Sequence, residues 1–241
     1  MQLKPGPQID PELKRALLVM GGFVEKSLDS ALQSLFQRNS YFFQEVETAE
    51  KEINRCHLQV DHLCEQSLAQ HRNSGPLLRH WMMAVKMNSD LERVGDQALN
   101  IAQTTKIYLL KQPIRELKDL KRLAADTQNM LKDALDSLAR EDATLANNVI
   151  ILDDLVSNMA HRLMRDLRIA LKQGLYPASS IIDVILILRN LEKISHHALN
   201  IAGHTIWALT GQSAHSEDFA DDSLDSFSTS FAPSTVPLDP L

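Results

Sequence analysis

The segment LERVGDQALNIA at residues 91–102 returns one hundred residues later as LEKISHHALNIA at residues 191–202. Seven of the twelve positions are identical, and two of the remaining five are conservative exchanges. Upstream, ALQSL at 31–35 matches ALDSL at 134–138, so the offset changes from 100 to 103. A change of this size indicates a length difference in one connecting loop. Self-similarity at a fixed period is the mark of a repeated structural unit, so the chain is predicted to contain two copies of one unit.

Turn and cap residues divide each copy into three helices. Asp10 is a candidate N-cap with Pro11 at the first helical position, and Gly174 and Gly211 bound the last helix. The chain has only 8 Gly and 9 Pro, which argues against a turn-rich β fold. The predicted helices cover about 11–38, 39–76, 76–110, 114–140, 142–172 and 177–210. We therefore predict an all-α protein with a lead at 1–9, three-helix repeats at 10–112 and 113–211, and a tail at 212–241.

The formal charge of −6 is concentrated in the tail. Residues 212–241 contain six acids and no Lys or Arg, whereas the rest of the chain has 25 acidic and 25 basic residues. A neutral body does not favour nucleic acid as a partner. The acidic, Ser- and Pro-rich tail is predicted to be disordered, although Phe219, Phe227 and Phe231 leave a short interaction motif as an alternative.

The sequence also predicts where the protein resides. No apolar run approaches the ~18 residues that a membrane span needs, and no cleavage site follows the N-terminal apolar stretch. Cys56 and Cys64 are eight residues apart in a predicted helix, about 12 Å at the helical rise, which is too far for a disulfide. Free thiols without an export signal predict a cytoplasmic protein.

Ionisable residues interrupt the apolar stripes of four predicted helices. The stripe of the second helix contains Glu50 and His57, and that of the fifth contains Asp153 at the position equivalent to Glu50. The third and sixth helices each place two ionisable groups four residues apart, Glu92/Asp96 and Glu192/His196, beside small residues that permit close helix packing. Buried carboxylates need a cation, a basic partner or water.

Two interpretations of these residues remain open. One is a carboxylate-rich metal site in the bundle core, where oxygen ligands suit Mg or Mn and an added His suits Fe or Zn. The other is salt bridging, with Arg189 three residues before Glu192 and Asp90 three before Arg93. The Glu-x-x-His pair of ferritin-like oxidases is absent, because Ser195 follows Glu192 by three residues.

No motif in the sequence indicates catalysis. His57, Asp61 and Cys64 fall on one helical face, but a packed histidine beside a buried thiol explains them more simply than a metal site does. Met82, Met83 and Met87 are predicted core residues. No Gly-rich phosphate loop, nucleophile elbow or zinc-type C-x-x-C spacing occurs. We therefore predict that the protein is not an enzyme.

These motifs together resemble the PhoU family of phosphate-uptake regulators. The resemblance rests on the repeated segment, on MGGFVEKSLDSAL at 20–32, on Arg79 thirteen residues before Glu92, and on HTIWALTG at 204–211. It covers residues 10–212. It implies a cytoplasmic adaptor that represses phosphate-starvation signalling by linking the ATPase subunit of a phosphate ABC transporter to a sensor histidine kinase. It also implies a homodimer that reaches the membrane only through its partners.

The resemblance implies metal sites as well. Some family members carry iron or zinc clusters on acidic x-x-x-Asp motifs, which fall here on Glu50/Asn54, Glu92/Asp96, Asp153/Ser157 and Glu192/His196. Only Glu92/Asp96 retains both acids, so a reduced Fe or Zn site is expected.

Arg79, Arg93 and Lys193 are the expected partner contacts. Two alternatives to the adaptor remain: a metal-binding helical-bundle protein, and a diverged paralogue that regulates a sodium–phosphate cotransporter.

Overall fold

The computed structural model describes residues 9–70, 75–114 and 118–212 of the 241-residue chain. It contains six helices: α1 (Pro11–Phe36), α2 (Phe42–Gln70), α3 (Gly75–Tyr108), α4 (Lys118–Arg140), α5 (Ala143–Lys172) and α6 (Ala178–Thr210). Within these described ranges no β-strand occurs, and the predicted all-α fold is confirmed. The largest differences from the predicted helix starts are at α2, which begins at Phe42, and at α4, which begins at Lys118. The lead up to residue 8 and the predicted tail from 213 onward lie outside the described residues.

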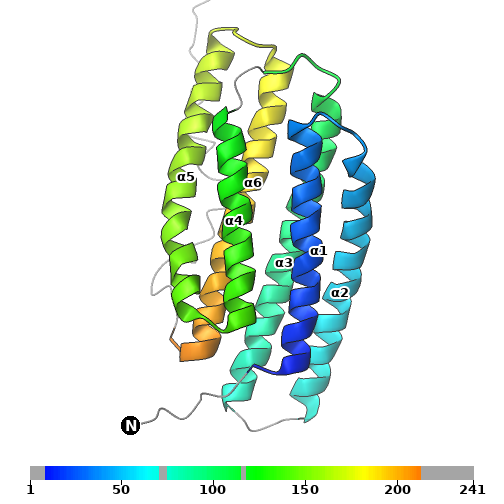
Figure 1. Ribbon diagram of the computed structural model, residues 1–241, viewed down its shortest axis with the longest axis vertical. Helices are drawn as coiled ribbons and strands as arrows, with labels where there is room; N and C mark the ends of the chain where they lie inside the picture. Colours follow the sequence, from blue (N-terminus) through cyan, green and yellow to red (C-terminus); the bar gives the residue numbers. More distant parts are fainter. Residues whose placement is uncertain (1–8, 71–74, 115–117, 213–241) are drawn as a thin grey trace, which may run out of the picture.

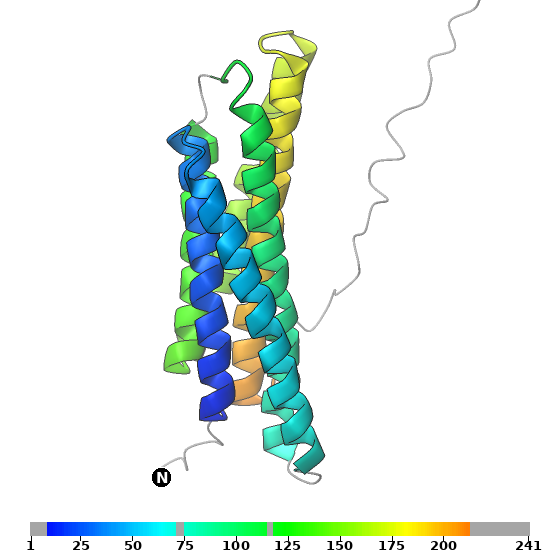
Figure 2. The same cartoon turned by 90° about the vertical axis from the view of Figure 1, so that its right-hand side faces the viewer.

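The six helices form two three-helix bundles that lie side by side (Figure 1). Helices α1–α3 make the first bundle and α4–α6 the second, and the two are joined along α3 against α6 and α1 against α4. Helices α2 and α5 flank this central group of four (Figures 1 and 2). Asp90 of α3 contacts His197 of α6, whereas Lys111 after α3 pairs with Asp183 near the start of α6, so the two helices run antiparallel.

The repeat is reproduced in the turns between helices. Arg38 and Glu141, which are 103 residues apart, both have left-handed backbone angles, with φ of 52° and 54°. The next residue in each turn donates its backbone N–H to an equivalent serine carbonyl, Asn39 to Ser34 and Asp142 to Ser137. The same connection therefore joins α1 to α2 and α4 to α5, as two copies of one unit require.

The predicted helix caps are present. The Asp10 carboxylate accepts the backbone N–H groups of Glu12 and Leu13 at 2.9 and 3.3 Å, and Pro11 occupies the first helical position. These bonds satisfy donors that have no partner inside the helix. Helix α6 ends at Gly211, whose φ of 75° is readily accessible only to glycine.

Small residues allow the helices to approach closely, as predicted for those beside the ionisable pairs of α3 and α6. A Cβ at Gly95 would lie 2.9 Å from Ile53 Cδ1, so the absence of a side chain lets α2 pack against α3. Gly21 plays the same part between the two repeats, because a Cβ there would lie 2.7 Å from Leu135 Cδ2 of α4. Ala98 and Ala198 are fully buried in the equivalent helices α3 and α6.

The predicted core stripes are correct for α2 and α5 and wrong for α3 and α6. On α5 every stripe residue except Asp153 is buried, and on α2 the apolar members from Val46 to Cys64 are buried. On α3 and α6, however, no residue of the predicted stripes is buried: the members range from partly buried, such as Leu99 and Ile185, to exposed. Their exposed apolar members are Leu78, Met82, Val85 and Ile182.

The core of α3 uses a different row of residues, among them Met83, Met87, Leu91 and Val94. The prediction of Met82 as a core residue is therefore wrong, although Met83 and Met87 are buried as expected. The physical reason is that α3 packs against α1, α2 and α6. A helix with neighbours on three sides carries apolar residues around most of its circumference, so periodicity alone does not identify its outer face.

None of the described helices combines the length and apolar character that crossing a membrane would require.

Candidate functional site

The first candidate cluster lies where α2 packs on α3. Glu50 of α2 is held near Glu92 and Asp96 of α3. Burial raises the pKa of Glu50, and the nearby carboxylates of Asp96 and Glu92 raise it further, while a hydrogen bond from Asn54 opposes the shift. The Asn54 amide donates to Glu50 Oε1 at 3.0 Å, but the buried Oε2 has no partner among the described residues. Gly95 permits this position, since a Cβ there would lie 3.3 Å from Oε2.

The second cluster occupies the equivalent place between α5 and α6. His196 Nε2 lies 4.0 Å from Asp153 Oδ2, and His161 Nε2 lies 3.7 Å from Glu192 Oε1. Burial raises the pKa of Asp153, and the charge of His196 opposes that shift. Asp153 Oδ1 is buried without a hydrogen-bond partner among the described residues, as is Glu50 Oε2 in the first repeat. His161 was missed in the sequence because it lies outside the repeated motif.

The fold thus brings together all six predicted metal residues in two groups of three. Glu50, Glu92 and Asp96 offer only oxygen donors, which suit hard cations such as Mn²⁺ or Mg²⁺. The second group contains His196, and His161 lies near its Glu192, so it mixes nitrogen and oxygen donors, which suit Zn²⁺ or Fe²⁺. In the part of the chain that the structure describes, no three such side chains already converge closely enough to hold one ion. The donor types fit a metal, whereas binding would require side-chain rearrangement.

The predicted partner contacts lie on the central helices. Arg93 on α3 and Lys193 on α6 are exposed, and Arg79 near the start of α3 is partly exposed. None of the three forms an ion pair with another described residue. Arg93 and Lys193 are one repeat length apart, so the pair follows the symmetry of the two repeats.

A charged cluster that the sequence did not predict joins the two repeats. The carboxylate of Asp90 lies 2.9 Å from His197 Nδ1 and 3.3 Å from His204 Nε2, and it accepts a hydrogen bond from the Asn200 amide at 3.2 Å. Burial alone raises the pKa of Asp90, but the hydrogen bonds and charges of the two histidines outweigh it and lower the pKa to about 2. In the sequence, the adjacent histidines of KISHHALN at residues 193–200 are the feature that could have indicated this cluster.

This cluster corrects the salt-bridge interpretation. Asp90 pairs across the repeat interface with histidines of α6, and no described ion pair joins it to Arg93. Glu192 lies near His161 of α5, and within the described residues it forms no ion pair with Arg189. The spacing of residues within one helix cannot indicate ion pairs that form between two helices.

His57, Asp61 and Cys64 form a packing cluster. The Asn88 amide of α3 donates to Asp61 Oδ1 at 2.9 Å and to the His57 carbonyl at 3.0 Å. The Cys64 thiol is buried against Trp81, and burial raises its pKa to about 11. A thiol that stays protonated is a poor metal ligand and a poor nucleophile. The hydrogen bonds of this cluster instead connect α2 to α3.

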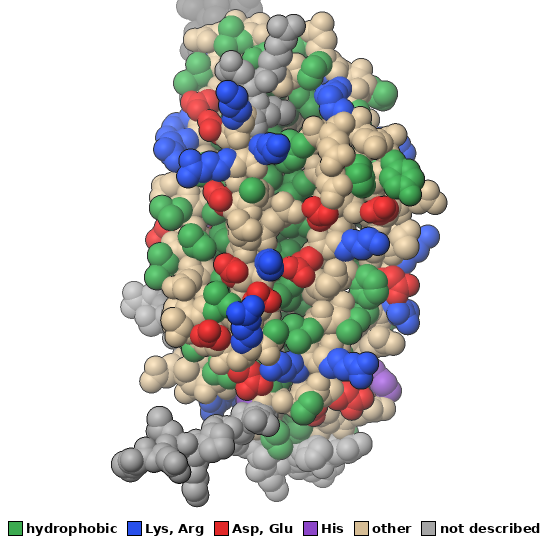
Figure 3. Space-filling view, in the orientation of Figure 1, with side chains coloured by type: hydrophobic (Ala, Val, Ile, Leu, Met, Phe, Trp, Pro, Cys, Tyr) green, Lys and Arg blue, Asp and Glu red, His purple; other side chains and the backbone are tan. Residues whose placement is uncertain are grey.

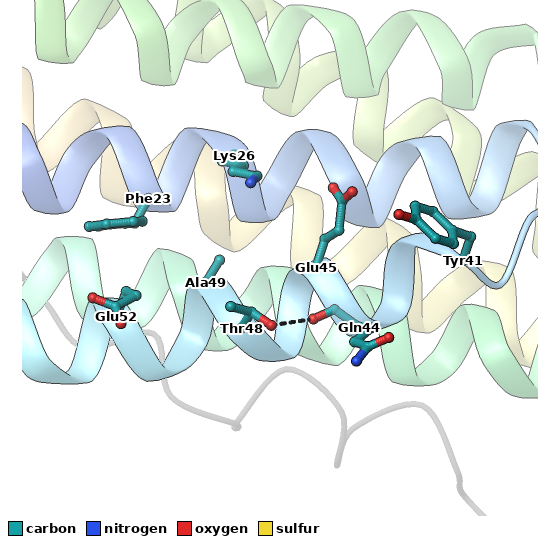
Figure 4. Close-up of a pocket in the computed structure, with 8 residues that line it drawn as sticks. All are labelled: Phe23, Lys26, Tyr41, Gln44, Glu45, Thr48, Ala49 and Glu52. Atoms are coloured by element: carbon teal, nitrogen blue, oxygen red, sulfur yellow. Dashed lines mark hydrogen bonds between the residues drawn. The ribbon is translucent and has the colours of Figure 1, made fainter.

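The surface on the side of α1 and α4 carries no concentrated charge. Lys and Arg side chains are interspersed with Asp and Glu across this face (Figure 3). A pocket lies along the junction of α1 and α2, lined by residues that include Phe23, Lys26, Tyr41 and Glu45 (Figure 4). Its lining contains none of the predicted metal residues. The candidate clusters therefore lie apart from this pocket, at the α2–α3 and α5–α6 contacts.

Known proteins resemble this chain in both of its repeats. The family model of the PhoU domain matches residues 17–105 and again residues 120–205, one match for each three-helix bundle. The phosphate-specific transport system accessory protein PhoU homolog of Pseudomonas putida is 32% identical over 202 residues, spanning 83% of this chain and 78% of that protein. The Escherichia coli K12 accessory protein PhoU is 26% identical over 200 residues, which are 83% of each chain.

Solved structures agree with this comparison. The crystal structure of PhoU from Pseudomonas aeruginosa superposes with a TM-score of 0.80 at 30% identity, and the match covers 83% of this chain and 97% of that one. The phosphate transport system regulatory protein PhoU from Streptococcus pneumoniae has a TM-score of 0.77 at 22% identity, covering 85% and 96% of the two chains. The second likeness concerns the fold alone.

Proposed function

The chain belongs to the PhoU family, and from that premise we propose that it is an accessory protein of a phosphate-specific transport system that regulates phosphate uptake. The observation that carries the proposal is the coverage of the match: both repeats fit the family domain, and the relatives are matched over most of their length. The sequence contains no catalytic motif, which suits a protein that acts by binding others.

More specifically, we propose that the protein is a cytoplasmic adaptor. It links the ATPase subunit of a phosphate ABC transporter to a sensor histidine kinase and represses starvation signalling when phosphate is ample. Arg93 and Lys193 support this proposal because they are exposed, carry no described ion pair and recur once in each repeat. Exposed basic residues arranged in this way suit recognition of acidic partner surfaces. A homodimer would present each contact twice.

Affinity purification from phosphate-replete native cells tests the adaptor. We expect the full-length bait to recover the transporter ATPase, the kinase or both, with recovery reduced severalfold by the double variant Arg93→Ala, Lys193→Ala. The matched control is Lys121→Ala, an exposed lysine on α4. Recovery of neither partner by a helical, folded bait would contradict the proposal. Recovery of a sodium–phosphate cotransporter would instead support the diverged-paralogue alternative.

Metal binding is a second candidate function, favoured by one observation. Glu50 Oε2 and Asp153 Oδ1 are buried carboxylate oxygens without described partners, and they occupy equivalent positions in the two repeats. A buried carboxylate oxygen that lacks a hydrogen-bond partner costs free energy that a cation would offset. Glu50, Glu92 and Asp96 would hold one ion, and Asp153, Glu192 and His196 another, with Fe or Zn as the expected metals.

Metal analysis of the purified chain tests this candidate. We expect bound Fe or Zn, and a higher thermal midpoint when Zn²⁺ or Mn²⁺ is added to the chelator-treated protein. Glu92→Gln, Asp96→Asn should abolish the Mn²⁺ effect, whereas the control Glu47→Gln, on the exposed side of α2, should keep it. An unchanged midpoint at millimolar metal would contradict metal binding without affecting the adaptor proposal.

A further inference from the structure

One end of α3 carries an exposed apolar row. Leu78, Met82 and Val85 are 45%, 46% and 43% exposed, and their spacing places them on one face of the helix. Single exposed apolar residues are ordinary, but a contiguous row on a long helix suggests a surface that binds something apolar. Among the described residues, no helix covers this row.

Basic side chains border the row on the side toward α6. Arg79 and Lys86 flank Met82, and Lys86 Nζ lies 5.6 Å from the centre of the Trp207 ring. Within the described residues, neither basic group forms an ion pair. The neighbouring acids are already engaged, since Asp90 is held by His197 and His204 and Asp61 by Asn88. This end of α3 therefore presents apolar surface and uncompensated positive charge together.

The chain leaves α6 at the same place. Gly211 ends the helix with φ of 75°, and a Cβ there would collide with the Arg79 guanidinium. The segment that follows thus begins beside Arg79. From Gly211 to Glu217 an extended chain spans at most about 20 Å, whereas Arg79 and Lys86 are only about 10 Å apart along α3.

The chemistry of that segment complements the surface. Residues 213–225 contain five acids and no Lys or Arg, and Phe219 lies directly after Glu217 and Asp218. We propose that segment 213–225 binds the exposed face of α3 at residues 78–86, with its carboxylates near Arg79 and Lys86 and Phe219 on the apolar row. Glu92 and Asp96 set the limit of this surface, because their negative charge would repel the segment further along α3.

The consequence is a surface that is occupied by the protein's own chain. Arg79 is also one of the expected partner contacts, so the bound segment would compete with partners at this end of the face. Such a segment is tethered, which gives it a high effective concentration even when each individual contact is weak. Binding of the segment requires no particular partner, so it can be measured on the purified chain alone.

Oxidative footprinting of Met82 measures whether the surface is covered. The full-length protein is compared with a full-length variant in which the five acids become amides: Glu217→Gln, Asp218→Asn, Asp221→Asn, Asp222→Asn and Asp225→Asn. If the segment is bound at least half the time, Met82 should be oxidised at least about twofold more slowly in the wild-type chain. The buried Met83 and Met87 serve as internal controls for folding. High salt should remove the difference.

Crosslinking locates the segment. With p-benzoyl-phenylalanine in place of Phe219, we expect intramolecular crosslinks to residues 77–86, reduced severalfold by Lys86→Glu but not by the control Lys121→Glu. Equal oxidation of Met82 in the two chains would overturn the proposal. So would crosslinks confined to other helices, or protection that rises with protein concentration, which would identify a second copy as the occupant.

Discussion

At the scale of single residues, Asp90 shows how the fold determines charge. The carboxylate is buried, which by itself disfavours ionisation, yet two histidines and an amide from α6 surround it and hold its pKa at about 2. Its ionised form is therefore stabilised by the folded state. The residue contributes to the junction between repeats through electrostatics that depend on a helix one hundred residues away in the sequence.

Replacing Asp90 by Asn should destabilise the protein. The pKa falls from 3.8 to about 2 on folding, so the stabilisation is fully present above pH 3.8 and is lost as the pH falls toward 2. A shift of this size corresponds to about 2 kcal/mol. Urea unfolding at pH 7 should show a loss of this order in Asp90→Asn. Near pH 2 the two proteins should converge, and an undiminished gap there would contradict the assignment.

Glu50 should behave in the opposite way. Burial and nearby carboxylates raise its pKa above 4.5, so folding disfavours its ionised form and the penalty grows as the pH rises through the folded pKa. In chelator-treated protein, Glu50→Gln should raise the thermal midpoint at pH 7 and change it little at pH 4. Glu47→Gln on the exposed side of α2 is the matched control. A lower midpoint for Glu50→Gln at pH 7 would show that the charge is compensated.

At the scale of the helices, glycines have different roles according to their surroundings. Gly22 lies in α1, and no atom would lie within 4 Å of a Cβ added at that position, whereas Gly211 ends α6 with φ of 75° beside Arg79. A glycine inside a helix costs stability because of its conformational freedom, while a glycine at positive φ has a conformation that other residues adopt poorly.

Alanine substitution should therefore have opposite signs at these two positions. Gly22→Ala should stabilise the protein by about 0.5–1 kcal/mol, because α1 gains helix propensity without a clash. Gly211→Ala should destabilise it by about 1 kcal/mol or more, because the left-handed conformation is strained and Arg79 must move. Thermal unfolding of the two variants provides the comparison. Destabilisation by Gly22→Ala would contradict the open surroundings of that position.

Helices also explain where the sequence prediction succeeded. Helix α5 packs on two neighbours, and the predicted row is the buried row, although Ile151 and Leu155 are exposed on its other side. Helix α3 packs on three, and its outer face is apolar at Leu78, Met82 and Val85 as well. The predicted stripe of α3 was therefore misassigned to the core.

At the scale of the whole molecule, the two repeats share one interior. The α3–α6 and α1–α4 contacts join them, and polar links such as Lys111 Nζ to Asp183 Oδ2 at 2.6 Å add to the apolar contacts. Separate domains that touch only at their surfaces can unfold separately, whereas a continuous core favours a single transition.

We therefore expect both repeats to unfold together. Each repeat contains one tryptophan, Trp81 in the first and Trp207 in the second. The single variants Trp207→Phe and Trp81→Phe allow fluorescence to follow one repeat at a time during urea unfolding. Their midpoints should coincide with that of far-UV circular dichroism, after correction for the stability of each variant. Two separated transitions would show that the repeats are independent.

The amino-acid sequence suffices to predict the helical class, the twofold repeat and the caps at Asp10 and Gly211. The assignment of six ionisable residues to metal sites stays a prediction: Glu50, Glu92, Asp96, Asp153, Glu192 and His196. These features depend on local backbone preferences and on spacing within a helix, which short-range physics sets. Packing of the complete chain places the predicted stripes of α3 and α6 outside the buried core, brings His161 close to Glu192, and pairs Asp90 with His197 and His204. Those outcomes depend on how many neighbours each helix has and on the antiparallel pairing of α3 with α6, which only packing of the complete chain specifies.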